Sequence, residues 1–174
     1  MLCKKQLVLE SENKIKLIVD FAIHDYYVEE KNAMQLFLEE HQSAFSPEET
    51  QVVQALLNSH ISLFAVEAVD QSKCTLELQD CLNPDLATAV LIDIGLSQSF
   101  DSELLLFTRV LTFENFNISS GAAFAFDFEI AEVLLKRYAK KLQKFPKLPE
   151  DTKHFLCFFK TLPAVWIRGG RKIH

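Results

Sequence analysis

Six basic residues fall within fourteen positions in the segment LLKRYAKKLQKFPK, residues 134–147. Lysine and arginine side chains can neutralise phosphates and release their counterions, so this segment could bind nucleic acid or an anionic membrane. Two arginines near the end of the sequence could extend the same surface. The candidate anion-binding residues are Lys136, Arg137, Lys140, Lys141, Lys144, Arg168 and Arg171.

The same basic segment also has a purely structural interpretation. At 100° per residue its cations fill one side of a helix, and charged side chains normally cover a solvent-exposed face. Residues 1–127 hold seven Lys/Arg and 20 Asp/Glu, a net charge of −13, whereas residues 128–174 hold 11 and four, a net charge of +7. We therefore expect the two parts to attract each other. Nucleic acid stays open as an alternative partner, and a membrane is not expected.

Catalytic chemistry has three histidine candidates. His24 is followed by Asp25, a metal-binding dipeptide of phosphohydrolases, but adjacent helical residues point about 100° apart and further ligands are missing from the neighbouring helices. His60 lies where a helix meets a strand, and His154 lies in an apolar helix, which suits hydrogen-bonded structural residues. An enzyme would need these histidines to converge with carboxylates in a cleft. The catalytic residues of such an enzyme are unknown, and the sequence favours a non-catalytic protein.

No cofactor or metal motif is present. Residues 95–99, GLSQS, lack the second glycine of a nucleophile elbow, and the four glycines form no phosphate-binding loop. The four cysteines show neither CxxC spacing nor a histidine at zinc spacing. They are Cys3, Cys74, Cys81 and Cys157. We therefore expect no metal site and no cofactor.

Three helices are predicted in the first sixty residues. Apolar residues at three- and four-residue steps predict a helix over residues 12–28. Asn32 can cap a second helix, on which Met34, Phe37, Leu38 and His41 share a face. Ser46, Pro47 and Glu49 form the capping box of a third helix.

The hydrophobic period then changes from that of a helix to that of a strand. The segment CTLELQ, residues 74–79, alternates apolar and polar side chains, which is typical of a strand with one buried face. Four further segments are strand-like: residues 62–70, 87–94, 103–113 and 116–126. Short strands with tight connections, including a turn expected over residues 97–101, predict a small antiparallel sheet or half-barrel. Five phenylalanines on or directly after these segments favour core positions over stacking platforms for bases: Phe113, Phe116, Phe124, Phe126 and Phe128.

Two helices are predicted after the strands, over residues 127–143, capped by Asp127, and residues 149–162. We expect one α+β domain over residues 1–174: a helical lead-in (1–60), a β-rich core (61–127), a helical part (128–162) and a basic tail (163–174). No apolar run reaches the ~18–20 residues that span a bilayer, and the first residues lack the pattern of a signal peptide, so a cytoplasmic location is expected.

Several segments resemble uncharacterised bacterial proteins that are often associated with SEC-C zinc motifs. The resemblance covers about residues 20–127 and is carried by SHISLFAVEAV, LQDCL, ELLLFTRVL and SSGAAF. It implies a helical lead-in followed by a small β-structure. The cysteine-rich SEC-C segment itself is absent, so the resemblance implies no zinc site here.

The absence of a catalytic pattern and the presence of both acidic and basic surfaces favour a non-catalytic protein-binding or adaptor module. The partner expected first is another protein. Nucleic-acid binding through the basic helix and an enzyme with a dispersed active site are the two alternatives.

Overall fold

The computed structural model of the chain describes residues 12–100 and 103–159. Within them lie six α-helices, five strands and two single-turn 3₁₀ helices, which confirms the α+β class with helices at both ends. The elements are α1 (Glu12–His24), α2 (Ala33–His41), α3 (Pro47–Leu57), β1 (His60–Asp70), β2 (Thr75–Asp80), β3 (Ala89–Ile92), α4 (Ile94–Ser99), β4 (Leu104–Thr112), β5 (Asn117–Asp127), α5 (Ala131–Leu142) and α6 (Glu150–Phe159). The predicted tail, residues 163–174, lies outside the described residues.

The five strands close into a barrel in the order β1-β2-β3-β5-β4. Strand β1 pairs antiparallel with β2 and β4, whereas β3 pairs parallel with β5. The sheet is therefore mixed and closed, where the sequence predicted an antiparallel sheet or half-barrel. The parallel pair arises because β3 leads into β4 through helix α4 rather than through a tight hairpin, so β5 returns beside β3 in the same direction. Five strands in this Greek-key order form a barrel of the OB type.

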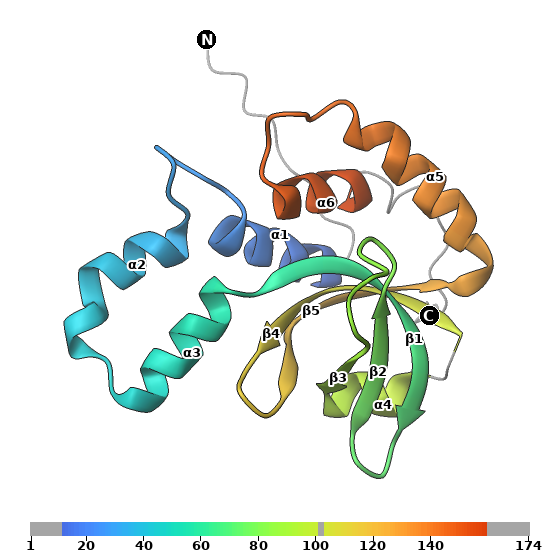
Figure 1. Ribbon diagram of the computed structural model, residues 1–174, viewed down its shortest axis with the longest axis horizontal. Coiled ribbons are helices and arrows are strands. Elements are labelled where there is room, and N and C mark those ends of the chain that lie inside the picture. The colour runs from blue at the N-terminus through green and yellow to red at the C-terminus, as the bar shows by residue number, and fades with distance from the viewer. Residues whose placement is uncertain (1–11, 101–102, 160–174) are drawn as a thin grey trace.

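Burial along the strands separates two faces of the barrel. Every residue of β4 except Thr112 is buried, because the interior covers one face of this strand and helices cover the other. Strand β2 instead alternates, with Leu76 and Leu78 inside and Glu77 exposed. Helices α1, α5 and α6 lie over β1, β4 and β5, whereas the short helix α4 lies beside β2 (Figure 1). Among the described elements, none covers Glu77, Val90 and Ile92, which are exposed on the outer face of β2 and β3.

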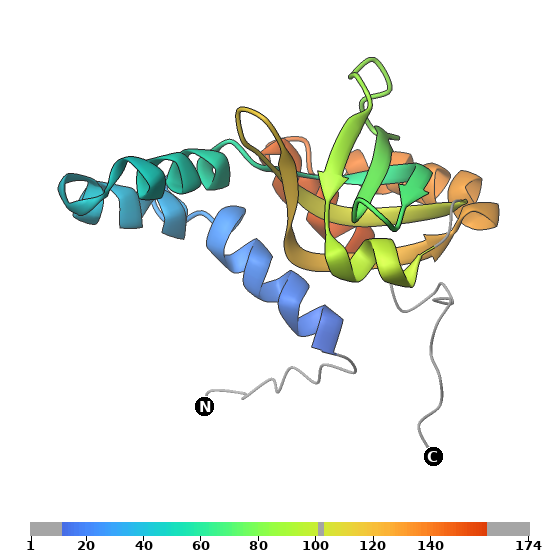
Figure 2. The same ribbon diagram turned by 90° about the horizontal axis from the view of Figure 1, so that it is seen from below.

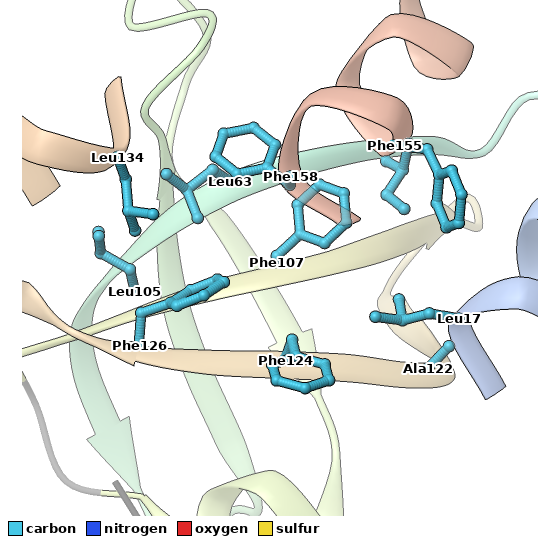
Figure 3. Packing of buried hydrophobic residues seen from close by; sticks show 11 residues of the cluster. Leu17, Leu63, Leu105, Phe107, Ala122, Phe124, Phe126, Leu134, Phe155 and Phe158 are labelled. Carbon is cyan, nitrogen blue, oxygen red and sulfur yellow. The ribbon is translucent and has the colours of Figure 1, made fainter. Parts of the chain in front are cut away.

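One hydrophobic core lies between the barrel wall and helices α1, α5 and α6 (Figure 3). Phe107 of β4 meets Phe158 of α6 at 4.9 Å between ring centroids. A second core fills the barrel interior. The helix-facing core comprises Leu17, Ile61, Leu63, Leu105, Phe107, Ala122, Phe124, Phe126, Leu134, Phe155 and Phe158. These two cores fix the orientation of β4, which carries the buried arginine described below.

The pairing of β4 with β5 contains a bulge. Thr108 pairs with Ala123 and Val110 pairs with Ser119, so β5 has extra residues opposite Arg109. Gly121, within this bulge, has φ +82°, in the left-handed region that favours glycine. The bulge interrupts the ladder at the position of Arg109.

Helices α2 and α3 form an arm that projects away from the barrel (Figure 2). Helix α3 begins with the predicted capping box, in which the Ser46 hydroxyl accepts from the Glu49 N–H at 3.2 Å and the Glu49 carboxylate accepts from the Ser46 N–H at 2.8 Å. The Asn32 side chain caps α2 by accepting from the Gln35 N–H at 2.8 Å. The N-terminal caps of both helices of the arm were therefore predicted correctly.

Three helix boundaries differ from the sequence-based expectation. Helix α1 ends at His24 rather than at residue 28, because a hairpin turn bridges Val28 and Lys31. Helix α4 occupies residues 94–99, where the end of a strand (residue 94) and the start of a turn (residues 97–101) were expected, since the Asp93 carboxylate accepts from the Leu96 N–H at 2.9 Å and caps the helix. Helix α5 begins at Ala131, after a 3₁₀ turn over residues 128–130, and Asp127 makes no capping hydrogen bond there.

The turn between α1 and α2 predicts a stabilising substitution. Glu29 and Glu30 have φ of 50° and 70°, which glutamate rarely adopts. Asparagine followed by glycine suits such a two-residue turn. We expect Glu29→Asn with Glu30→Gly to raise the free energy of unfolding by about 1 kcal/mol in urea denaturation. An unchanged or lower value would show that the turn is not strained.

Candidate functional site

The basic face of α5 is the first candidate site from the sequence. Lys136 pairs with Glu132 on the same helix, and the Lys141 ammonium donates to the Cys157 carbonyl oxygen of α6 at 3.2 Å. Three further cations are exposed: Arg137, Lys140 and Lys144. Arg168 and Arg171 lie outside the described residues, so the structure brings together only the α5 part of the predicted surface.

Within the described residues, one ion pair between the acidic and basic parts of the chain has the opposite polarity to the one expected. Asp151, in the carboxyl-terminal part, lies 3.6 Å from Arg109 in the acidic part. Within the described residues, no ion pair involves Arg137, Lys140 or Lys144.

The three histidines occupy different environments. The ring of His154 is buried, with Nδ1 2.9 Å from the Ile61 carbonyl oxygen and Nε2 3.9 Å from a Glu150 carboxylate oxygen. His60 is partly exposed and lies 3.8 Å from Asp80. His24 is buried beside Arg109. The two pockets described below contain no histidine.

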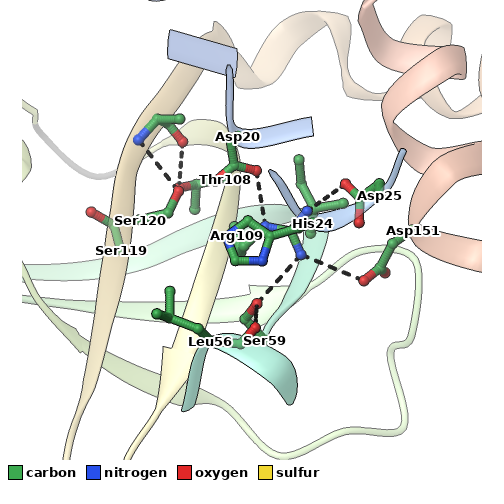
Figure 4. A network of polar contacts seen from close by, with 12 residues as sticks. Asp20, His24, Asp25, Leu56, Ser59, Thr108, Arg109, Ser119, Ser120 and Asp151 are labelled. Carbon is green, nitrogen blue, oxygen red and sulfur yellow. Dashed lines mark hydrogen bonds and ion pairs between the residues drawn. The ribbon is translucent and has the colours of Figure 1, made fainter. Parts of the chain in front are cut away.

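Arg109 is the centre of a buried polar network (Figure 4). Its side chain is 1 % exposed, and Nε donates to the Asp20 carboxylate at 2.9 Å while Nη2 donates to Asp25. Nη1 lies 3.5 Å from the Ser59 hydroxyl oxygen and 3.6 Å from Asp151. A planar guanidinium with its forked donors suits this arrangement, which a lysine could not reproduce.

The network joins elements far apart in the sequence. Asp20 and Asp25 come from the end of α1, Ser59 from the junction of α3 with β1, and Asp151 from α6. Asp25 precedes the arm and Ser59 follows it, so Arg109 contacts both ends of the arm at its base. The Thr152 hydroxyl of α6 reinforces this base by donating to the Asp25 carbonyl oxygen at 2.9 Å.

Burial changes the protonation of two neighbouring groups in opposite directions. The pKa of Asp25 is raised to about 7, chiefly by burial; Arg109 opposes this increase, whereas Asp151 and Asp20 contribute to it. Burial also lowers the pKa of His24 to about 4, and Arg109 contributes to this decrease. Near pH 5.5 the folded protein therefore holds a proton on Asp25 and a neutral His24, whereas the unfolded chain holds the proton on the histidine.

These two shifts predict opposite pH dependences in two variants. The pKa of Asp25 is higher in the folded protein than in the unfolded chain, so its stabilisation of the fold is present at low pH and is lost as pH rises from about 4 to 7. The pKa of His24 is lower in the folded protein, so its stabilisation of the fold is gained as pH rises from about 4 to 6.5. In the wild type the two effects largely cancel. Relative to wild type, we expect the free energy of unfolding to rise with pH in Asp25→Asn and to fall in His24→Asn, by at most about 1.4 kcal/mol per pH unit. Urea titrations between pH 4 and 7 measure both slopes, and parallel slopes in the two variants would contradict the assignment.

The outer face of β2 and β3 is the surface that OB barrels commonly use for oligonucleotides. Here its exposed residues are apolar or acidic: Val90, Ile92 and Glu77. Because these exposed residues include no cation, this face is poorly suited to phosphate.

The phenylalanines weighed as stacking platforms occupy different environments. Phe113 and Phe116 stack on each other with ring centroids 4.6 Å apart, whereas Phe124 and Phe126 are buried in the core as predicted. Phe116 and Phe128 are exposed, contrary to that prediction.

An open apolar groove of about 710 Å³ lies between α2 and α3. Helix α2 has no buried residue, although five of its nine residues are apolar. Phe37 and Val52 are 44 % and 45 % exposed within the groove. The lining comprises Ile23, Ala33, Met34, Phe37, Phe45, Glu48, Glu49, Val52, Val53 and Leu56. A second, more polar pocket of about 270 Å³ lies between α3 and the turn after β4.

Comparison with protein families matches residues 1–162 to a family of unknown function. The chain belongs to DUF7986. The match contains the Arg109 network and the arm and ends before the basic tail. No curated protein and no solved structure gave a match to this DUF7986 chain. The resemblance to proteins associated with SEC-C motifs stays a prediction.

Sequence reasoning missed Arg109 as the central residue of this DUF7986 structure. One signal could have identified it: Arg109 is the single charged residue in the apolar strand segment LLLFTRVLT. An arginine in a strand that is buried on both faces requires carboxylate partners. Among the described residues, no group of three or more His, Cys, Asp and Glu side chains could hold a metal ion, and no helix is long and apolar enough to cross a membrane.

Proposed function

We propose that this DUF7986 protein is a cytosolic, non-catalytic protein-binding module whose partner docks in the groove between α2 and α3. The observation that carries the proposal is the exposure of α2. Apolar residues on a helix normally pack into a core, whereas in the described part of the chain α1 and α3 cover the apolar face of α2 only partly and leave none of its side chains buried. Isolated exposed apolar residues are common, but a contiguous apolar groove on a projecting arm is typical of an interaction site.

The shape of the groove favours a protein segment over a small molecule. Small-molecule sites contain convergent polar groups that orient the ligand. Here the polar lining residues are two glutamates on α3, and Glu49 is already engaged in the helix cap. Two short helices that leave an apolar groove between them suit an amphipathic helix, which inserts its apolar face and needs few polar contacts.

The Arg109 network supports this function by fixing the base of the arm. It contacts the chain before α2 through Asp25 and after α3 through Ser59. The Asn32 side chain adds a hydrogen bond of 2.6 Å from Nδ2 to the His24 carbonyl oxygen. A groove held open in the free protein loses less conformational entropy when a partner binds.

Photo-cross-linking in cells tests the proposal by comparing three faces of the molecule. A benzoylphenylalanine residue is placed at Val52 in the groove, at Val90 on the barrel and at Lys140 on α5. We expect one protein to be captured from position 52 alone, and the purified form of that protein to bind the purified full chain. Capture from position 90 or 140 alone, or no capture, would contradict the proposal.

Nucleic-acid binding through α5 is the second candidate function. It is favoured by the exposed cations Arg137, Lys140 and Lys144, for which the described residues provide no ion pair. A gel shift at ~50 mM salt tests it. Binding that is lost in Lys140→Glu with Lys144→Glu would support this candidate, and no binding to any oligonucleotide would remove it.

A further inference from the structure

We infer that the groove between α2 and α3 selects an apolar segment flanked by lysine or arginine, most simply a basic amphipathic helix. This inference rests on the proposed function and specifies the chemistry of the partner. Its basis is the charge of the arm. Residues 33–57 contain four glutamates and no lysine or arginine.

The position of the glutamates determines which partner charges the groove accepts. Glu48 and Glu49 line the groove beside Val52, and both belong to the first turn of α3. Glu48 is exposed and forms no ion pair within the described part of the chain. A partner that places a cation next to this rim gains an attractive interaction, whereas an acidic partner meets carboxylates of the same sign.

The same charges argue against other occupants. A second copy docking through the same face would bring two acidic arms together, which like charges disfavour. Nucleic acid and anionic lipid are repelled for the same reason. Helix α5 of another copy is basic, but its apolar face is already covered, since Leu134 is buried and Tyr138 stacks on Phe158 at 5.2 Å.

Two synthetic helical peptides test the inference by fluorescence anisotropy on the full chain. Both carry leucine at positions i, i+3, i+4 and i+7, and their remaining positions carry lysine in one peptide and glutamate in the other. We expect the lysine peptide to bind about tenfold more tightly than the glutamate peptide, with a preference that weakens as salt rises. Equal affinity, or no binding of the lysine peptide, overturns the inference.

A matched pair of variants separates the groove from the overall charge of the protein. Glu48→Lys and Glu77→Lys change the net charge equally, but Glu77 lies on the outer face of β2. We expect Glu48→Lys to weaken the lysine peptide about fivefold or more and Glu77→Lys to change it by less than about twofold. Equal effects of the two variants would mean that net charge, rather than the groove, attracts the peptide.

Two further outcomes distinguish this inference from the proposed function. If both peptides bind equally and both are lost in Phe37→Glu, the groove is a docking site without the charge preference, and only the inference fails. If a chain ending at residue 162 binds the lysine peptide about tenfold more tightly than the full chain, the basic tail occupies the groove. That result would overturn the inference of a separate basic partner.

Discussion

Replacing Arg109 with methionine is expected to lower the free energy of unfolding by about 3–5 kcal/mol at pH 7. The variant keeps a side chain of similar length but leaves Asp20, Asp25 and Asp151 without the cation that they share. Removing one partner of a buried ion pair costs far more than the pair itself contributes, because the remaining charge stays desolvated. Urea unfolding of the full chain measures this loss.

The pH dependence of this variant identifies the cause of the loss. Without the cation, which lowers the pKa of both Asp25 and Asp151, these two pKa values rise further, so the protonated forms stabilise the fold at low pH and the stabilisation disappears as pH rises. We therefore expect a smaller loss at pH 5 than at pH 7. Arg137→Met, on the exposed face of α5, is the matched control and should change stability by less than about 0.5 kcal/mol. A loss in Arg109→Met that equals the control, or that does not depend on pH, would contradict the role of the network.

Phe37→Glu is expected to weaken binding of the partner captured at position 52 by about 30-fold or more, which corresponds to the loss of an interface hot spot. The substitution places a carboxylate in the apolar groove, next to Phe45, whose ring centroid lies 5.7 Å from that of Phe37. Since the Phe37 side chain is already largely exposed, the fold itself should be little affected. Isothermal titration with the purified partner measures the affinity.

Leu36→Glu is the matched control for this prediction. Leu36 is the preceding residue on α2, is 48 % exposed and does not line the groove. The two variants carry the same charge change on the same helix, and we expect Leu36→Glu to retain binding within about threefold. Similar losses in both variants, or unchanged binding in Phe37→Glu, would show that the partner does not use the groove.

Local patterns in the sequence predicted the elements of this fold well. Ser46 and Glu49 form the expected capping box, and the alternation of residues 74–79 corresponds to β2. These features depend on interactions over a few residues. The closed barrel with a parallel β3–β5 pair was not predicted, because it depends on how α4 redirects the chain between strands.

The candidate site was less accessible to sequence reasoning. Arg109 meets Asp20 and Asp25 across sequence separations of 89 and 84 residues, which no local pattern reveals. The apolar face that contains Met34 and Phe37 was identified on α2. The sequence could not reveal that this face stays exposed among the described elements, because the apolar pattern of a helix does not depend on whether another element covers it.

The most direct test of the account is chemical-shift mapping of the ¹⁵N-labelled full chain with the purified partner captured at position 52. We expect the perturbed amides to concentrate on α2 and α3, around Phe37, Val52 and Leu56. Perturbations confined to α5 or to the outer face of β2 and β3 would contradict the claim that the groove on the arm is the docking surface.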